Sequence, residues 1–235
     1  MRTLRVATYN VHGHKGMDRR VSTDRPLQVL RQIGADCIAL QEFVNAATAG
    51  EPLLERWARA LGMQAACAPA FERGGEVFAT AILSRLNILE THTHDISLRG
   101  YRRRVMLEVV LDAGDVRVQA MSVHLGVSPR ERARQAEQLY AICSATRADV
   151  HLLLGDFNEW HRFGVVASRL RRHFGVGRRL ATFPAASPLL PLDRIYVHPR
   201  ERLLDTHVVT MAAARRASDH LPLVATIALA AAPRA

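Results

Sequence analysis

The chain has 235 residues, of which 49% are hydrophobic and 23% are charged, and its formal net charge is +10 at pH 7. This length and composition exclude a disordered chain, a collagen-like fibre and a small disulfide scaffold, and they predict one domain over residues 1–235. Lys15 is the one lysine among the 32 cationic side chains, and the rest are arginines. The positive surplus favours an anionic partner, such as nucleic acid or an anionic lipid surface, but fits equally an arginine-rich composition that serves solubility.

Cysteine content and apolar runs bear on the compartment. Cys37, Cys67 and Cys143 are odd in number, widely spaced and set among apolar neighbours, so reduced, buried thiols are expected. The N-terminal residues contain no signal-peptide core, and the longest apolar stretch, residues 221–233, is shorter than the roughly 20 residues of a membrane span. We therefore expect a cytoplasmic monomer without a transmembrane segment.

Short runs of Val, Ile and Leu alternate along the chain with segments of helical periodicity. The runs that predict strands are residues 4–8, 37–40, 79–83, 105–111, 116–123, 150–154, 194–197 and 223–227. Helices are predicted from Asp24 to about Ile33, from Glu51 to Leu61 and from Pro129 to about Thr146. Residues 162–179 hold six arginines, which form either a solvated helix face or an electropositive rim. The interleaved elements predict an α/β or α+β fold with strands in two layers.

Polar side chains stand where these strands end or begin. They are Asn10, Gln41, Glu42, His124, Asp156, Asn158, Asp193, Asp219 and His220. Any one of them alone is more often a turn residue, a helix cap, an exposed acid or a partly buried histidine. Six such strand boundaries are harder to dismiss, because ligand and catalytic groups gather where loops converge at the ends of a sheet.

The residue types at these positions fit metal-assisted phosphoester hydrolysis. Carboxylate oxygens suit Mg²⁺ or Mn²⁺, which complete their coordination with water and phosphate oxygens. A carboxylate beside a histidine orients the ring as a base, or holds it as a positive charge against a phosphoryl oxygen. Amides donate hydrogen bonds to the same centre. A zinc protease would need paired histidines on one helix, and the sequence has none.

The motifs, in this order, are similar to those of the endonuclease/exonuclease/phosphatase superfamily. They are Ala7-Thr8-Tyr9-Asn10-Val11, Leu40-Gln41-Glu42, Ser122-Val123-His124-Leu125, Leu154-Gly155-Asp156-Phe157-Asn158, Leu192-Asp193-Arg194-Ile195-Tyr196 and Ser218-Asp219-His220-Leu221-Pro222-Leu223. The resemblance extends from Val6 to Leu223 and implies a four-layer α/β/β/α sandwich of two facing mixed sheets, with the site at one end. It is greatest to small bacterial members of the deoxyribonuclease and sphingomyelinase-like group.

The resemblance also implies roles for the site residues. Glu42 would bind the divalent cation, Mg²⁺ or Mn²⁺, with Asn10 and Asp219 close to it. Asp193 would orient His220. In the remaining motifs, Asp156 would position or deprotonate the attacking water, Asn158 would bind the phosphate, and His124 would contact the phosphate and assist the leaving group. The motifs leave open which residue is the general base.

Departures from the family's subgroups bear on the substrate. Phe43-Val44 follows the second motif, where abasic-site enzymes have Thr-Lys, and the third motif has His124 where those enzymes have Tyr and Asn. Pro191-Leu192 stands where inositol phosphatases have Trp-Cys. We therefore predict a phosphodiesterase that acts on a lipid headgroup or another small phosphodiester. A DNA or RNA nuclease is the alternative, and a non-catalytic binding module is a third reading that the intact set of site residues disfavours.

Arginine placement separates the first two functions. A nuclease needs a strip of cations along neighbouring phosphates, whereas an enzyme for small substrates needs one or two at a compact pocket. Of residues 102–104, one arginine is expected to point into the site and fork onto a phosphate, with Arg103 and Arg104 as the candidates. The remaining arginines are expected to be solvated and scattered.

Overall fold

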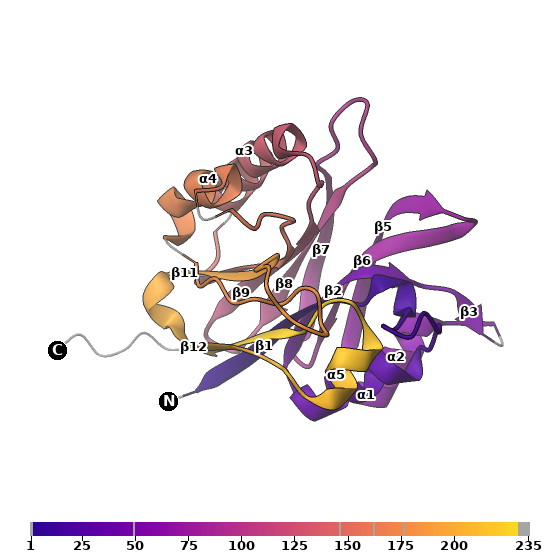
Figure 1. The fold of residues 1–235 in the computed structure, drawn as a ribbon. Coiled ribbons are helices and arrows are strands. Elements are labelled where there is room, and N and C mark those ends of the chain that lie inside the picture. Colours follow the sequence, from indigo (N-terminus) through magenta and orange to yellow (C-terminus); the bar gives the residue numbers. More distant parts are fainter. Residues whose placement is uncertain (1, 49, 146, 162, 176, 230–235) are drawn as a thin grey trace.

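Two facing β-sheets form the centre of this computed structural model, with helices on both outer sides (Figure 1). The structure describes residues 2–48, 50–145, 147–161, 163–175 and 177–229. The six-stranded sheet contains, in spatial order, β12 (Leu203–Val208), β13 (Leu223–Ala228), β1 (Thr3–Asn10), β2 (Cys37–Val44), β6 (Glu76–Ser84) and β5 (Gln64–Arg73). The five-stranded sheet contains β11 (Asp193–His198), β10 (Val150–Asp156), β9 (Arg117–His124), β8 (Val105–Asp112) and β7 (Asn87–Asp95).

Helices cover the outer face of each sheet. On the six-stranded sheet these are α1 (Asp24–Ile33), α2 (Leu53–Leu61) and α5 (Ala212–Ala217), and on the five-stranded sheet they are α3 (Pro129–Ala145) and α4 (Val165–Phe174). A short ribbon of β3 (Ala47–Thr48) and β4 (Glu51–Pro52) precedes α2. The predicted four-layer sandwich of two mixed sheets is thus confirmed.

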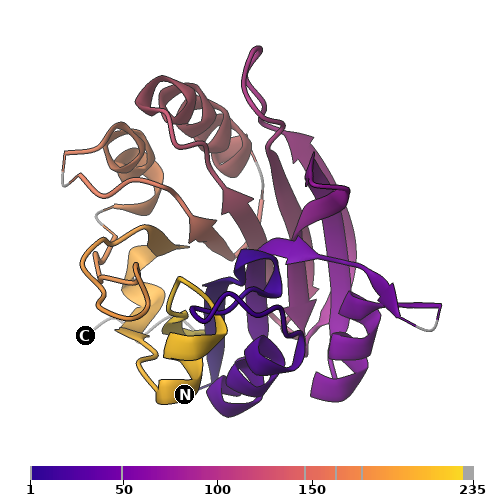
Figure 2. The ribbon, with the colours of Figure 1, turned by 45° about the vertical axis from the view of Figure 1, so that its right-hand side comes forward.

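The period-2 pattern of the strands builds three layers of core. Leu4 and Val6 of β1 point between the sheets, where they meet Leu152 and Leu154 of β10. The alternate residues face the helices, as Tyr9 does beneath the helices of the six-stranded sheet. The last strand, β13, pairs antiparallel with β1, and the turned view in Figure 2 shows yellow α5 beside indigo α1. The two ends of the chain therefore fold against each other.

Strand register brings the polar strand boundaries to one end of the sandwich. Parallel pairing of β1 with β2 places Asn10 opposite Gln41. Parallel pairing of β9 with β10 places His124 opposite Asp156, and antiparallel β11 places Asp193 on the other side of Asp156. Residues far apart in the sequence thus become neighbours in two facing rows.

The structure adds elements that hydrophobic runs did not predict. Strand β7 is almost wholly exposed, and β5 and β12 lie at sheet edges, so none carries a continuous apolar run. Helix α2 begins at Leu53 because Glu51 and Pro52 form β4. Helix α3 ends at Ala145 in the described chain, and the predicted end at Thr146 lies outside the described residues.

Two smaller expectations concern thiols and membrane spans. Cys37, Cys67 and Cys143 take part in no disulfide, and Cys37 and Cys143 are buried as expected, whereas Cys67 is only partly buried. In the described parts of the chain, no helix is both long enough and apolar enough to cross a membrane.

Candidate active site

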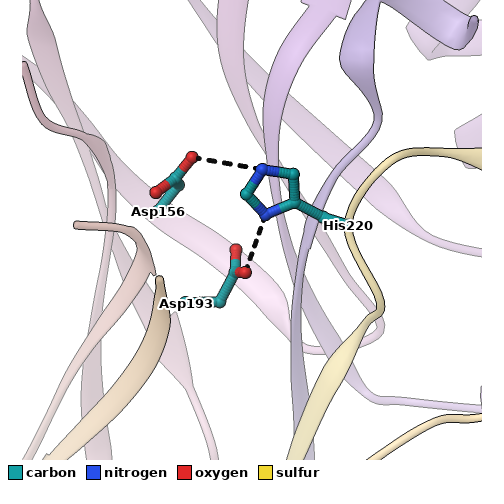
Figure 3. Close-up of side chains that lie close together, drawn as sticks. All are labelled: Asp156, Asp193 and His220. Carbon is teal, nitrogen blue, oxygen red and sulfur yellow. Dashed lines mark hydrogen bonds and ion pairs between the residues drawn. The ribbon is translucent and has the colours of Figure 1, made fainter. Parts of the chain in front are cut away.

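Asp156, Asp193 and His220 lie together between the sheets (Figure 3). The Nδ1 atom of His220 is 2.8 Å from Oδ2 of Asp193, and its Nε2 atom is 3.7 Å from Oδ2 of Asp156. The hydroxyl of Thr182 donates to the same Asp193 oxygen at 2.5 Å. Burial alone would lower the pKa of His220, but the carboxylates of Asp193 and Asp156 raise it to about 10. The ring is therefore an imidazolium at neutral pH, oriented by Asp193.

The glycine at position 155 allows β10 to place Asp156 in this cluster. A Cβ atom at residue 155 would lie 2.0 Å from the carbonyl oxygen of Val123 on the neighbouring strand, and the φ angle of Gly155 is +152°. Only glycine permits so close an approach of two backbones. The Leu-Gly-Asp sequence is thus a packing requirement of the site.

Asp156 is the hub of the hydrogen bonds. Its Oδ2 atom accepts from the side-chain amide of Asn10 at 3.1 Å, and its Oδ1 atom accepts from the backbone N–H of Asn158 at 2.9 Å. The side-chain amide of Asn158 donates to the carbonyl of Leu125. Asn158 has a left-handed backbone, with φ +51°. Asn adopts this conformation more readily than most other residues with a side chain. The carboxylate is therefore fixed from both sheets.

His124 and His220 differ in charge. Its Nε2 atom lies 3.6 Å from Asp156 and 3.9 Å from Glu42. Burial lowers the pKa of His124 to about 3, and the positive charge of Arg104 contributes to that shift. The two histidines beside Asp156 are thus held in different protonation states.

The backbone at Glu42 differs from the strand end that the sequence predicts. Strand β2 does not end at Leu40, as predicted, but continues to Val44, and its pairing with β6 shifts register between Leu40 and Phe43. Glu42 lies in this bulge with φ +50°. A bulge re-aims a side chain without ending the strand, and here Glu42 faces His124 and Arg73, whose guanidinium is 3.8 Å away.

Asp219 lies on the other side of Asn10 and pairs with a histidine that the sequence analysis did not select. Its Oδ2 atom is 2.6 Å from Nδ1 of His12. Ser218 ties this loop to β1, since its hydroxyl donates to the carbonyl of Asn10 at 2.7 Å. Two carboxylates act on the His12 ring, because the hydrogen bond to Asp219 raises the pKa of His12 and the charge of Glu42 adds to the effect. The structure thus places His12 in contact with Asn10 and Asp219, and the charge of Glu42 acts on its ring.

Arg103 and Arg104 differ in burial and in their contacts. Arg104 is buried, its Nε and Nη1 atoms have no hydrogen-bond partner, and its charge acts on His124, Asp156 and Glu42. Arg103 is exposed, donates to the carbonyl of Pro69 and lies 3.7 Å from Asp95, so its guanidinium is already engaged away from the cluster. Of the two candidates, Arg104 is the one whose charge acts on the site residues, whereas the guanidinium of Arg103 contacts Pro69 and Asp95.

The arginine-rich segment, residues 162–179, includes α4 and the loops on both sides of it. Arg162 is outside the described residues. Arg169 pairs with Glu137 and Arg178 lies 3.9 Å from Asp205. Arg171 and Arg179 line a cavity of about 420 Å³ beside α4. The side chains of this segment therefore spread around α4 and its following loop.

Several of these groups could hold a metal ion. Within the described residues, the donor atoms of Asp156, Asp193 and His220 all lie within 4.8 Å of one another, the one trio of His, Cys or acidic residues at that spacing. Glu42 and Asp219 are the carboxylates that solvent reaches, with 16% and 25% of their side chains exposed, against 2% for Asp156. Thr182 and His12 are the contacts that the sequence analysis missed. A histidine two residues after the first motif was a usable signal, whereas nothing local marked Thr182.

Comparisons with known proteins agree with this arrangement. A family model described as "Endonuclease/Exonuclease/phosphatase family" matches residues 7–220. The uncharacterised protein YbhP of Escherichia coli (strain K12) is 29% identical over 255 aligned residues, which cover 97% of each chain. An endonuclease/exonuclease/phosphatase of Bacteroides vulgatus has a similar fold, with TM-score 0.79 and 16% identity over 98% of this chain and all of the other.

A second structural similarity is to ANGEL2, described as a 2′,3′-cyclic phosphatase, with TM-score 0.74 and 15% identity over 95% of this chain and 94% of that one. At such identities the structural matches establish the fold. The family match spans most of the chain and includes every residue of the cluster around Asp156, from Asn10 to His220. The chain is a member of the endonuclease/exonuclease/phosphatase family.

Proposed function

We propose that this protein is a Mg²⁺- or Mn²⁺-dependent phosphodiesterase whose substrate is a lipid headgroup or another small phosphodiester. The observation that carries the proposal is the convergence of Asp156 with the Asp193–His220 pair, Asn10 and His124 at one end of the two sheets. The family membership and a cyclic phosphatase among the fold neighbours support phosphoester chemistry.

The cation is assigned to Glu42, Asn10 and Asp219. These two carboxylates are open to solvent, whereas the side chain of Asp193 is fully buried and its Oδ2 atom already accepts from His220 and Thr182. Carboxylate and amide oxygens are the donors that Mg²⁺ and Mn²⁺ take in proteins. A divalent cation at this position supplies a Lewis acid that offsets charge on the phosphoryl oxygens.

The chain's own residues divide the remaining work. Asp156 is fixed by Asn10 and Asn158 and positions the attacking water as an oxygen acceptor. The imidazolium of His220 faces the phosphoryl oxygens as a positive charge, and Asp193 keeps it oriented. His124 is a neutral donor to the phosphate or leaving group. The unpaired donor atoms of Arg104 bind a phosphate oxygen.

Exposed apolar side chains around the site favour a lipid headgroup over a nucleic acid. Val127, Trp160, Phe163 and Leu189 are between 56% and 76% exposed. They lie in the loops after β9, after β10 and before β11, which all open at the end of the sheets that holds Asp156. Aromatic and aliphatic side chains of this kind insert at a membrane interface, and a +10 chain favours an anionic one.

The test is a substrate screen with the purified protein and Mg²⁺ or Mn²⁺. It covers sphingomyelin, phosphatidylglycerol and cardiolipin vesicles, inositol phosphates, plasmid DNA and RNA. We expect hydrolysis of a phospholipid or small phosphodiester. Nicking of plasmid DNA that falls steeply with salt, with no lipid turnover, would favour the nuclease instead.

Trp160 provides a physical readout beside the screen. The other tryptophan, Trp57, belongs to α2 and is buried in the core, so a change in emission on adding ligand reports Trp160. Phosphatidylglycerol vesicles should shift the emission to shorter wavelength, and phosphatidylcholine vesicles should do so less. Quenching by single-stranded DNA with no response to vesicles would support base stacking.

A further inference from the structure

His12 lies in the site although it belongs to none of the six motifs. It follows the end of β1 by two residues, and its backbone N–H donates to the side-chain oxygen of Asn10 at 3.0 Å. Its ring nitrogen Nδ1 lies 2.6 Å from Oδ2 of Asp219, and 33% of its side chain is exposed. The ring is therefore held next to two of the residues assigned to the cation, on the side that a hydrated ion can reach.

The second histidine of the same turn shows what a structural histidine looks like here. His14 is buried, its ring packs edge-on against Phe43 and Trp57, and its Nε2 atom bonds the carbonyl of Val44. His12 has a carboxylate partner and an exposed edge in place of an apolar environment. The turn η1 (His12–His14) thus sends one ring into the core and the other into the site.

We propose that His12 and Asp219 are adjacent ligands of the divalent cation, and that the imidazole makes the site prefer Mn²⁺, or another first-row transition ion, to Mg²⁺. Neighbouring ligands of an octahedral ion with bonds near 2.1 Å lie about 3 Å apart, close to the observed separation of the two donor atoms. An imidazole nitrogen suits transition ions, whereas Mg²⁺ selects oxygen. The inference rests on the proposed function only for the location of the cation.

A purely orienting role for His12 is the competing account. In it, the ring donates a hydrogen bond to Asp219 and only the carboxylate binds the ion. The two accounts differ in one observable, because only direct ligation couples the electron spin of Mn²⁺ to an imidazole nitrogen. A preference between metals follows from direct ligation and not from orientation alone.

The experiment is pulsed electron paramagnetic resonance on the full chain loaded with Mn²⁺, without substrate, together with titration of Mn²⁺ and Mg²⁺ affinity. We expect a ¹⁴N coupling in the wild type that is lost in His12→Gln. We also expect at least about a 10-fold weaker Mn²⁺ affinity, with Mg²⁺ affinity changed by less than about threefold. His207→Gln is the matched control, since His207 is an exposed histidine that also pairs with an aspartate, Asp205 at 3.0 Å, on the edge strand β12.

Absence of ¹⁴N coupling in the wild type overturns the proposal even if His12→Gln fails to fold. Coupling that persists in a folded His12→Gln protein overturns it too, and assigns the imidazole ligand to another histidine. Hydrolysis of bis(p-nitrophenyl) phosphate is measured in parallel. Nitrogen coupling without hydrolysis contradicts the proposed function and leaves the metal assignment standing, whereas hydrolysis without coupling does the reverse.

Discussion

At one end of the sheets His220 and His12 each bond a carboxylate, whereas at the other end His151, His173 and His198 pack against one another. The rings of His173 and His198 stack with centroids 4.4 Å apart, and His151 meets His173 edge-on at 5.1 Å. Within the described residues, no carboxylate lies within ion-pair distance of these three rings. The same residue type therefore serves charge at one end and packing at the other.

The titration of the two groups differs accordingly. Burial lowers the pKa of His173 to about 4, and the neighbouring histidines add to the shift. At the site, carboxylate partners overcome the effect of burial and raise the pKa of His220 to about 10. A carboxylate that bonds the ring directly keeps His220 charged, whereas burial and the nearby charge of Arg104 keep His124 neutral even though Asp156 lies 3.6 Å away.

The largest expected effect comes from removing that partner at the site. Asp193→Asn keeps the volume but removes the charge that orients His220, so we expect kcat on bis(p-nitrophenyl) phosphate to fall about 10⁴-fold with little change in the circular dichroism spectrum. Asp205→Asn removes the carboxylate of the exposed His207 pair and is the control. A kcat within tenfold of wild type for Asp193→Asn would refute the orienting role.

The neutral histidine of the site should matter next. His124→Ala removes a side chain beside Asp156 and is expected to lower kcat by about 10²–10⁴-fold. His92→Ala, at an exposed position of β7, should leave kcat unchanged. Equal rates for the two variants would show that His124 only fills space.

Arg104 is expected to act mainly on substrate binding. Arg104→Met keeps an unbranched side chain but removes the guanidinium that lies over Phe71 and carries the unpaired donors, so KM should rise about 10–100-fold, the equivalent of one or two charge-assisted hydrogen bonds. Arg103→Met, whose guanidinium is engaged by Pro69 and Asp95, should change KM little. A larger effect at Arg103 than at Arg104 would reverse the assignment.

The smallest effect concerns the packed histidines. Burial lowers the folded-state pKa values of His151 and His173, so the unfolded chain binds more protons and stability falls as the pH drops from about 6.5 towards 4. His173→Phe keeps the ring but cannot be protonated. We expect it to recover about 1 kcal/mol at pH 5, roughly 2–4 °C in Tm, a figure kept small because the ring is partly exposed. Thermal melting at pH 5 and pH 7.5 measures this, and an unchanged pH dependence would contradict it.

Motifs predicted the parts of the site that strand boundaries fix. Asp156, Asp193 and His124 stand at positions that the register of three neighbouring strands aligns, so their sequence order was enough to place them together. Glu42 was found as a strand end, yet it lies in a bulge that continues to Val44. Glu42 was therefore predicted from its residue type, although a bulge and not a strand end sets its position.

Contacts between segments far apart in the sequence could not be predicted from motifs in this way. Thr182 reaches Asp193 across a loop, and His12 meets Asp219 only because β13 folds back on β1. Neighbouring residues of an extended chain point to opposite sides, so residues 102–104 predicted one inward arginine without identifying Arg104. The edge strand β7 was missed because its exposed face carries polar residues in place of an apolar run.

Metal dependence is the most direct test of the central claim that the cluster around Asp156 hydrolyses phosphodiesters with a divalent cation. The protein is stripped with EDTA and assayed on bis(p-nitrophenyl) phosphate before and after Mg²⁺ or Mn²⁺ is returned, beside Asp156→Asn. We predict no turnover in EDTA, full recovery with the metal, and none in the variant under either condition. Turnover that persists in excess EDTA, or that survives in Asp156→Asn, would contradict the claim.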